Sequence, residues 1–223
     1  MMGIPMTDLN ALFKLQSWLS PAFPIGAFSY SSGLEAAIEN GYVSDAQSLS
    51  EWLTAQLENG AAWNDAVLLT LSWRTAGDKA QLAELSELAI ALCFSHLRQK
   101  ETCEQGVAFT KAARAWSATM CLPDGCPLPV AVGAVAANHQ LGLTPTVAAF
   151  LHGYISNQIQ CALRLMKLGQ QGGVELLALL EASTIEIAKQ ASEAGLEDLC
   201  SNTFVADIAA IKHQTLVSRI FIS

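Results

Sequence analysis

The sequence predicts an all-α protein, a single-domain helical bundle of roughly eight to ten helices spanning residues 1–223. Three observations predict this class. Apolar residues recur at helical spacing through most of the chain. Prolines, glycines and capping residues divide the pattern into segments of helical length. No stretch shows the period-2 alternation of apolar and polar side chains that a half-buried strand requires.

The first half of the chain contains several helix starts and stops. Ser32-Gly-Leu-Glu35 and Ser44-Asp-Ala-Gln47 both have the form of a capping box, and Thr7 is a plausible N-cap for the first helix. Prolines 21 and 24 end that helix, and Gly41 and Gly60 favour the ends of the next two helices. Helices are therefore expected over 8–19, 32–40, 44–59, 61–75, 78–100 and 101–120.

The second half begins with a proline-rich linker over 121–129, which predicts a turn region. Residues 130–137 are small and apolar on every side, which is typical of a helix in the centre of a bundle. Thr144-Pro145 then begins a long helix of roughly 24 residues that Gly169 would end. Two further helices are expected over 174–191 and 202–214.

The composition excludes two classes of partner. A net charge of −8 and the absence of any Lys/Arg run argue against nucleic acid. No run of about 18 apolar residues exists, and polar residues interrupt the closest candidate, 147–166, so no membrane span is expected. The N-terminus lacks the basic flank and apolar core of a signal peptide, which indicates a cytoplasmic protein. Because 52% of the residues are hydrophobic and only 14% are charged, part of the apolar surface is expected to meet other proteins.

Six cysteines are scattered without a C-x-x-C pair, which is typical of reduced thiols rather than a disulfide framework. The closest candidates for metal ligands are Cys121 and Cys126 with His139, and Cys93 with His96. Neither group has the paired spacing of a structural zinc site, so no metal site is predicted.

No catalytic motif is present in the sequence. The chain has no Gly-x4-Gly-Lys-Ser/Thr loop, no Gly-x-Ser-x-Gly elbow and no His-Glu-x-x-His, and its four histidines lie far apart. The sequence therefore predicts no enzyme and no cofactor.

The two ends of the chain are unusual. The loop between the first two expected helices is broken by two prolines and Gly26, yet it is rich in aromatic and apolar residues, including Phe28 and Tyr30. The tail, 213–223, is apolar around a single cation, Arg219, whereas chain ends are usually polar and frayed. Each segment either covers the protein's own core or docks onto a partner.

Both ends carry a resemblance to a known family. Ser20-Pro-Ala-Phe-Pro-Ile-Gly-Ala-Phe-Ser-Tyr-Ser-Ser-Gly-Leu-Glu35 closely resembles the N-terminal signature of the UreF family of urease accessory proteins. Residues 129–137, 141–143 and 164–170 look like the family's core, and 213–223 is similar to its "HE...SRLF.S" terminus. The tail departs from that pattern at Gln214, Leu216 and Val217, which puts any salt bridge or aromatic contact made there in doubt, and at Ile220, which is a conservative change.

The resemblance implies a non-enzymatic scaffold. With UreD/UreH and the GTPase UreG, such a protein enables nickel insertion into the urease apoprotein and regulates the GTPase. It implies a homodimer whose N-terminal segment, 1–30, and C-terminal tail, 213–223, dock UreD/UreH. The alternative is a metallochaperone that carries nickel on its own cysteines and histidines.

Matching family positions imply the partner-binding residues, although a contact between Tyr30 and Arg219 within one chain is an alternative. Glu35 is expected to act as a helix cap more than as a contact. The full set is Tyr30, Arg219, Gly26, Gly33, Leu34, Glu35, His213, Ser218 and Phe221.

Overall fold

The computed structural model describes residues 8–116 and 122–223, and every regular element in those ranges is a helix. The prediction of an all-α bundle is confirmed. The α-helices are α1 (Leu9–Trp18), α2 (Leu34–Glu39), α3 (Ala46–Asn59), α4 (Ala61–Arg74), α5 (Lys79–Ala91), α6 (His96–Ala113), α7 (Leu128–Asn138), α8 (Leu143–Leu165), α9 (Gly169–Glu193) and α10 (Phe204–Lys212). Three short 3-10 turns are η1 (Ala27–Ser29), η2 (Leu196–Asp198) and η3 (His213–Thr215).

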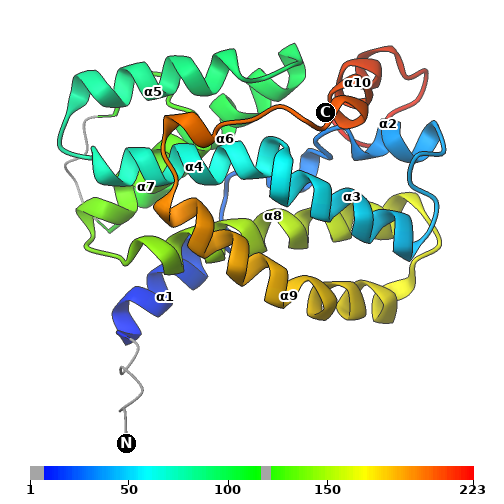
Figure 1. Ribbon diagram of the computed structural model, residues 1–223, viewed down its shortest axis with the longest axis horizontal. Helices are drawn as coiled ribbons and strands as arrows, with labels where there is room; N and C mark the ends of the chain where they lie inside the picture. Colours follow the sequence, from blue (N-terminus) through cyan, green and yellow to red (C-terminus); the bar gives the residue numbers. More distant parts are fainter. Residues whose placement is uncertain (1–7, 117–121) are drawn as a thin grey trace, which may run out of the picture.

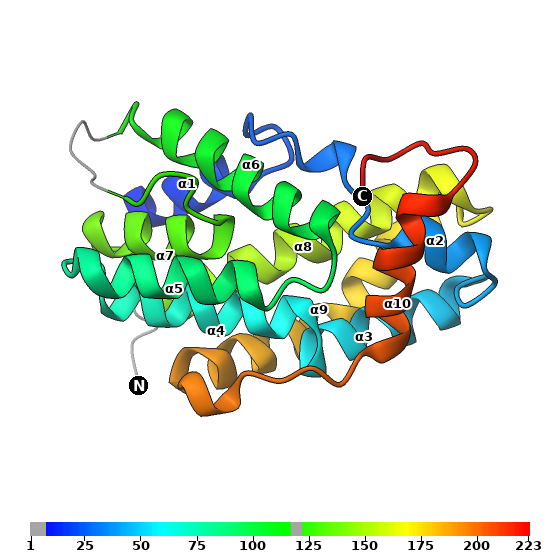
Figure 2. The same cartoon turned by 90° about the horizontal axis from the view of Figure 1, so that it is seen from above.

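The helices pack around a centre formed by α4, α7 and α8. Helix α4 packs along α7, α6 covers another side of α7, and α8 lies against α9. At one end of the bundle, α10 lies beside α2, and the C-terminus of the chain ends close to both (Figures 1 and 2). The last helix of the chain is thereby placed next to the second.

Helix α7 occupies the central position that its composition predicts. Every residue from Pro129 to Ala136 is buried. A Cβ atom built on Gly133 would lie 2.1 Å from Ser72 Oγ and 2.2 Å from the Leu69 carbonyl oxygen of α4. Glycine at this position therefore allows the two helices to approach more closely than any other residue would.

The expected helices over 78–100 and 101–120 are wrong in their division. The chain breaks after Ala91, and a new helix, α6, begins at His96. The Ser95 side chain accepts a hydrogen bond from the Arg98 amide at 3.1 Å, so it caps α6. The serine at the break outweighs the continuous apolar pattern on which the prediction rested. Helix α6 ends at Ala113, and the expected end at residue 120 lies outside the described ranges.

Other predicted boundaries shift because different residues cap the helices. Thr7 lies outside the described residues, and Asp8 caps α1 by accepting from the Asn10 amide at 2.9 Å. Gly169, with a φ of +73°, begins α9 instead of ending α8. In the described ranges, no helix combines the length and the apolar character needed to cross a membrane.

Candidate functional site

The N-terminal loop and the C-terminal tail lie side by side. The Ser31 amide donates to the Ser223 carbonyl oxygen at 2.8 Å, and the Ile222 amide donates to the Ser29 carbonyl oxygen at 2.8 Å. The Ser31 hydroxyl also donates to the Ser223 carbonyl oxygen. The tail therefore folds back onto its own chain, and the two unusual ends of the sequence form one structural unit.

Glu35 joins these two ends, and its predicted role as a capping residue is wrong. Helix α2 begins at Leu34 after Gly33, which has no side chain to cap it, and the Ser31 hydroxyl, not that of Ser32, accepts from the Glu35 amide at 3.3 Å. The Glu35 carboxylate instead accepts hydrogen bonds from the Ile220 amide at 2.6 Å and the Phe221 amide at 3.1 Å. It also contacts His213 Nε2 at 2.9 Å. The carboxylate lies in the first turn of α2, facing the tail.

The protonation of Glu35 affects how firmly the tail is held. Burial alone would raise its pKa, but the Ile220 amide, His213 and the Phe221 amide together lower the pKa below its ordinary value. A lowered carboxyl pKa contributes stability that is present above the ordinary value and is lost as the pH falls through the lowered one. At neutral pH the carboxylate is ionised and can accept from all three donors.

Gly33 allows α2 and α10 to approach closely. It has a φ of +86°, in the left-handed region that favours glycine. A Cβ atom there would lie 3.0 Å from the backbone nitrogen and the Cα atom of Ala210 in α10. Both its conformation and its surroundings therefore require glycine.

Replacing Gly33 by alanine is expected to lower the free energy of unfolding by about 2 to 3 kcal/mol, from backbone strain and a steric conflict with α10. Gly41→Ala is the matched control, because Gly41 has a φ of +74° with no atom within 4 Å of an added Cβ. Strain alone should cost the control about 1 kcal/mol. Urea denaturation measures both variants, and equal losses would show that the contact with α10 contributes nothing.

Tyr30 is buried and bonds to α6 rather than to the tail. Its hydroxyl donates to Glu104 at 2.5 Å, and its carbonyl oxygen accepts from Asn157 Nδ2 at 3.1 Å. Burial and the bond to Glu104 raise the pKa of Tyr30 above its ordinary value, so the hydroxyl stays protonated. The alternative of a Tyr30–Arg219 contact is wrong, because Arg219 is exposed and the hydroxyl is committed to Glu104.

The tail has a buried face and an exposed face. Phe221 is 3% exposed, and the Arg164 guanidinium lies 4.4 Å from the centre of its ring. Ser223 is also buried, whereas Ser218, Arg219 and Ile220 are exposed. The tail is therefore anchored by Phe221 while it presents its arginine to solvent.

Helix α10, which leads into the tail, carries further exposed apolar side chains that were not among the predicted site residues. Ala209 is the only buried residue of this helix, which packs against α2. The sequence does indicate these exposed side chains, because the expected helix at 202–214 carries more large apolar residues than one buried stripe can hold. We call the exposed set the α10–tail surface: Phe204, Val205, Ile208, Ile211, Val217, Arg219, Ile220 and Ile222.

A buried polar network connects the tail to the interior of the bundle. Glu101 of α6 accepts from the Ser223 hydroxyl at 2.7 Å and from the Ser32 hydroxyl at 2.9 Å. It also pairs with Arg98 Nη1 at 3.2 Å, and Arg98 pairs in turn with Asp65 of α4. Burial alone would lower the pKa of Arg98, but Asp65 and Glu101 raise it. The network therefore holds a permanent cation between two carboxylates.

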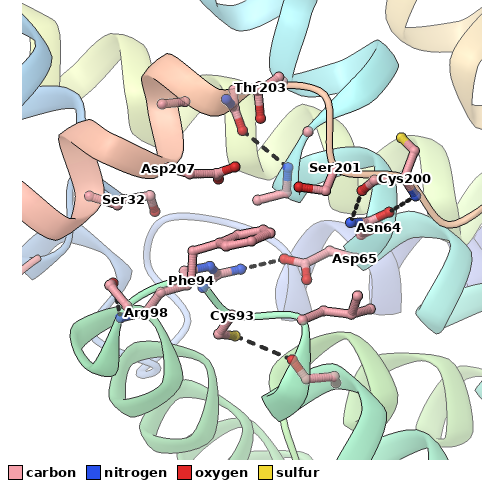
Figure 3. A pocket seen from close by; sticks show the side chains of 18 of the residues that line it. Ser32, Asn64, Asp65, Cys93, Phe94, Arg98, Cys200, Ser201, Thr203 and Asp207 are labelled. Carbon is pink, nitrogen blue, oxygen red and sulfur yellow. Dashed lines mark hydrogen bonds and ion pairs between the residues drawn. The ribbon is translucent and has the colours of Figure 1, made fainter.

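The Arg98–Asp65 pair lies between two cavities. Figure 3 shows the two side chains pointing toward each other in a pocket of about 50 Å³, with Asp207 of α10 on the opposite wall. A second cavity of about 110 Å³ shares Arg98, Asp65 and Tyr154 with the first. Sequence patterns could not find this arrangement, because its members come from four different helices.

Burial affects the thiols of two candidate metal ligands, Cys93 and Cys126. Within residues 8–116 and 122–223, no group of three or more histidine, cysteine, aspartate or glutamate side chains could hold a metal ion. Cys121, one of the candidate ligands, lies outside those ranges. Burial raises the pKa of Cys93 to about 11 and that of Cys126 to about 11, which disfavours the thiolate form that binds metals.

The matching family model and the most similar known proteins agree with one another. The family model described as UreF matches residues 43–181. The chain is 46% identical over 214 residues to urease accessory protein UreF 1 of Brucella anthropi, covering 95% of this chain and 94% of that protein. It is 47% identical over 216 residues to urease accessory protein UreF of Rhizobium leguminosarum bv. viciae, covering 96% and 97%. It is also 47% identical over 221 residues to UreF 1 of Brucella suis biovar 1, covering 97% of both chains.

Proposed function

Since this chain belongs to the UreF family of urease accessory proteins, we propose that it is a non-enzymatic scaffold for urease maturation. With UreD/UreH and the GTPase UreG, it enables nickel insertion into the urease apoprotein and regulates GTP hydrolysis by UreG. It works as a homodimer. The family resemblance supplies the identities of these partners.

The observation that carries the docking proposal is the α10–tail surface. Its apolar side chains are large and exposed, with Phe204 at 67% and Ile220 at 55%. Exposed apolar patches of this kind mark protein interaction sites, and an arginine beside them is a typical anchor. We assign this surface to UreD/UreH, because it combines the tail with the helix that leads into it.

The residues implied by the resemblance divide into two roles. Ser218 and Arg219 are exposed and are proposed to contact the partner directly. Tyr30, Leu34 and Phe221 are buried and are proposed to support the docking surface from beneath. The remaining members also support it: Gly26 and Gly33 through their left-handed backbones, and Glu35 and His213 through their contact with each other.

The docking proposal predicts that Arg219→Ala combined with Ile208→Asp lowers capture of UreD/UreH at least about tenfold, as expected for an anchor residue and a charge placed in an apolar interface. Both residues are exposed, so the variant should fold normally. The control combines Arg114→Ala at the end of α6 with Val174→Asp on α9, two exposed positions outside the surface. Capture by pull-down measures the effect, and undiminished capture by a well-folded variant overturns the proposal.

Regulation of UreG is tested separately. GTP hydrolysis by UreG is measured with and without this chain, in the presence of UreD/UreH. We expect the hydrolysis rate to change when the chain is added and to return toward that of UreG alone with the Arg219→Ala, Ile208→Asp variant, because that variant cannot assemble. An unchanged rate on adding the wild-type chain removes the regulatory part of the proposal.

A further inference from the structure

The register of the tail decides which of its side chains face outward. From residue 220 to 223 exposure alternates: Ile220 and Ile222 are exposed, whereas Phe221 and Ser223 are buried. Although residues 220 and 221 form a bend, this alternation means that a slip of the tail by one residue would expose Phe221 and bury its neighbours. The outward face of the tail therefore exists in only one register.

Glu35 contacts the tail at the point where this register is set. One carboxylate oxygen accepts from the Ile220 amide, and the other accepts from the Phe221 amide and contacts His213. His213 is completely buried at the start of the tail, directly after α10. A single side chain of α2 thus holds the first residue of the tail and two successive amides near its end.

We infer that Glu35 is a positioning residue for partner docking: it latches the tail in the one register that turns Ile220 and Ile222 outward, next to the exposed Arg219, and Phe221 inward. The inference rests on the proposed function for the identity of the partner, but the latch itself concerns this chain alone. Glu35 acts through the tail and does not touch the partner, because its carboxylate is buried beneath the segment that it holds.

A carboxylate suits this role better than any neutral side chain. It offers two acceptor oxygens and no donor, so it can accept from three donors at once. A glutamine of the same size has one acceptor oxygen, and its amide group would point a donor at another donor. Without an acceptor, the Phe221 amide and the His213 ring would be buried without a partner, which favours the detached tail.

Amide hydrogen exchange of the isolated chain tests the latch. In Glu35→Gln and Glu35→Ala, the Ile220 and Phe221 amides are expected to exchange at least about tenfold faster, because hydrogen bonds to a charged group are lost. Glu39→Gln, an exposed glutamate of the same helix, is the matched control and should leave both rates unchanged. Unchanged exchange in both Glu35 variants overturns the inference, whether or not any partner binds.

Affinity for UreD/UreH then tests whether the latch serves docking. If only the latched tail binds, the apparent dissociation constant should rise by the same factor by which the latched fraction falls. A purely structural role would not produce this agreement between exchange and affinity. Faster exchange with unchanged affinity overturns the inference, whereas failure of the wild-type chain to bind UreD/UreH counts against the proposed function instead.

Discussion

Replacing Arg98 by alanine is expected to lower the free energy of unfolding by about 3 to 5 kcal/mol, the typical cost of breaking a buried ion pair from one side. Arg98 pairs with both Asp65 and Glu101, and its side chain is only 16% exposed. Without the guanidinium, two carboxylates would remain in the interior without a cation. The Ser223 and Ser32 hydroxyls also bond to Glu101, so loosening of the tail should accompany the loss of stability.

Urea denaturation measures the change, and two further variants serve as controls. Lys100→Ala removes a half-exposed cation from the same helix, 3.8 Å from Glu104, and should change stability by about 0.5 kcal/mol or less. Adding Asp65→Asn to Arg98→Ala removes one of the stranded charges and should restore part of the loss. If Arg98→Ala costs no more than Lys100→Ala, the buried pair does not contribute to stability as described.

Gly133→Ala is expected to lower the free energy of unfolding by about 3 kcal/mol or more, the upper range for overpacking a core. Alanine favours a helix over glycine by about 1 kcal/mol, so helix propensity alone predicts the opposite sign. The steric conflict outweighs that gain because the new methyl group would meet a backbone carbonyl of α4, which cannot rotate away. The central pair of helices would have to separate.

Side chains of increasing size at position 133 check this prediction. Gly133→Val should destabilise the protein more than Gly133→Ala, because each added carbon increases the separation of α4 and α7. Gly77→Ala is the control, since an added Cβ at Gly77 meets no atom within 4 Å. Thermal and urea unfolding should both rank the wild type as most stable, Gly133→Ala next and Gly133→Val last. A Gly133→Ala variant as stable as the wild type would contradict the close packing of the two helices.

Helix propensity and periodicity predicted the bundle well because they act over short distances along the chain. The all-apolar composition of 130–137 is sufficient to predict a central helix, and α7 is one. Boundaries were predicted less well where two local signals compete. Ser95 ends an apolar pattern that otherwise runs on, and Gly169 suits the start of one helix as well as the end of another.

Glu35 shows why the candidate site could be found but not interpreted from sequence. Ser32-x-x-Glu35 matches a capping box, and nothing within the N-terminal segment distinguishes that role from another. The competing partners, His213 and the amides of Ile220 and Phe221, lie at the far end of the chain. A pattern of neighbouring residues carries no information about such a contact.

The sequence by itself determined the helical class, the buried centre and the family, because hydrophobic periodicity and short motifs are written in consecutive residues. Only the tertiary structure decided that the two ends form one unit. It turns Phe221 inward and Arg219 outward, it bonds the Tyr30 hydroxyl to Glu104 in place of the alternative contact with Arg219, and it bonds the Ile220 amide to Glu35. The physical reason is that buried hydrogen bonds between distant segments form only once the helices have packed and brought those segments together.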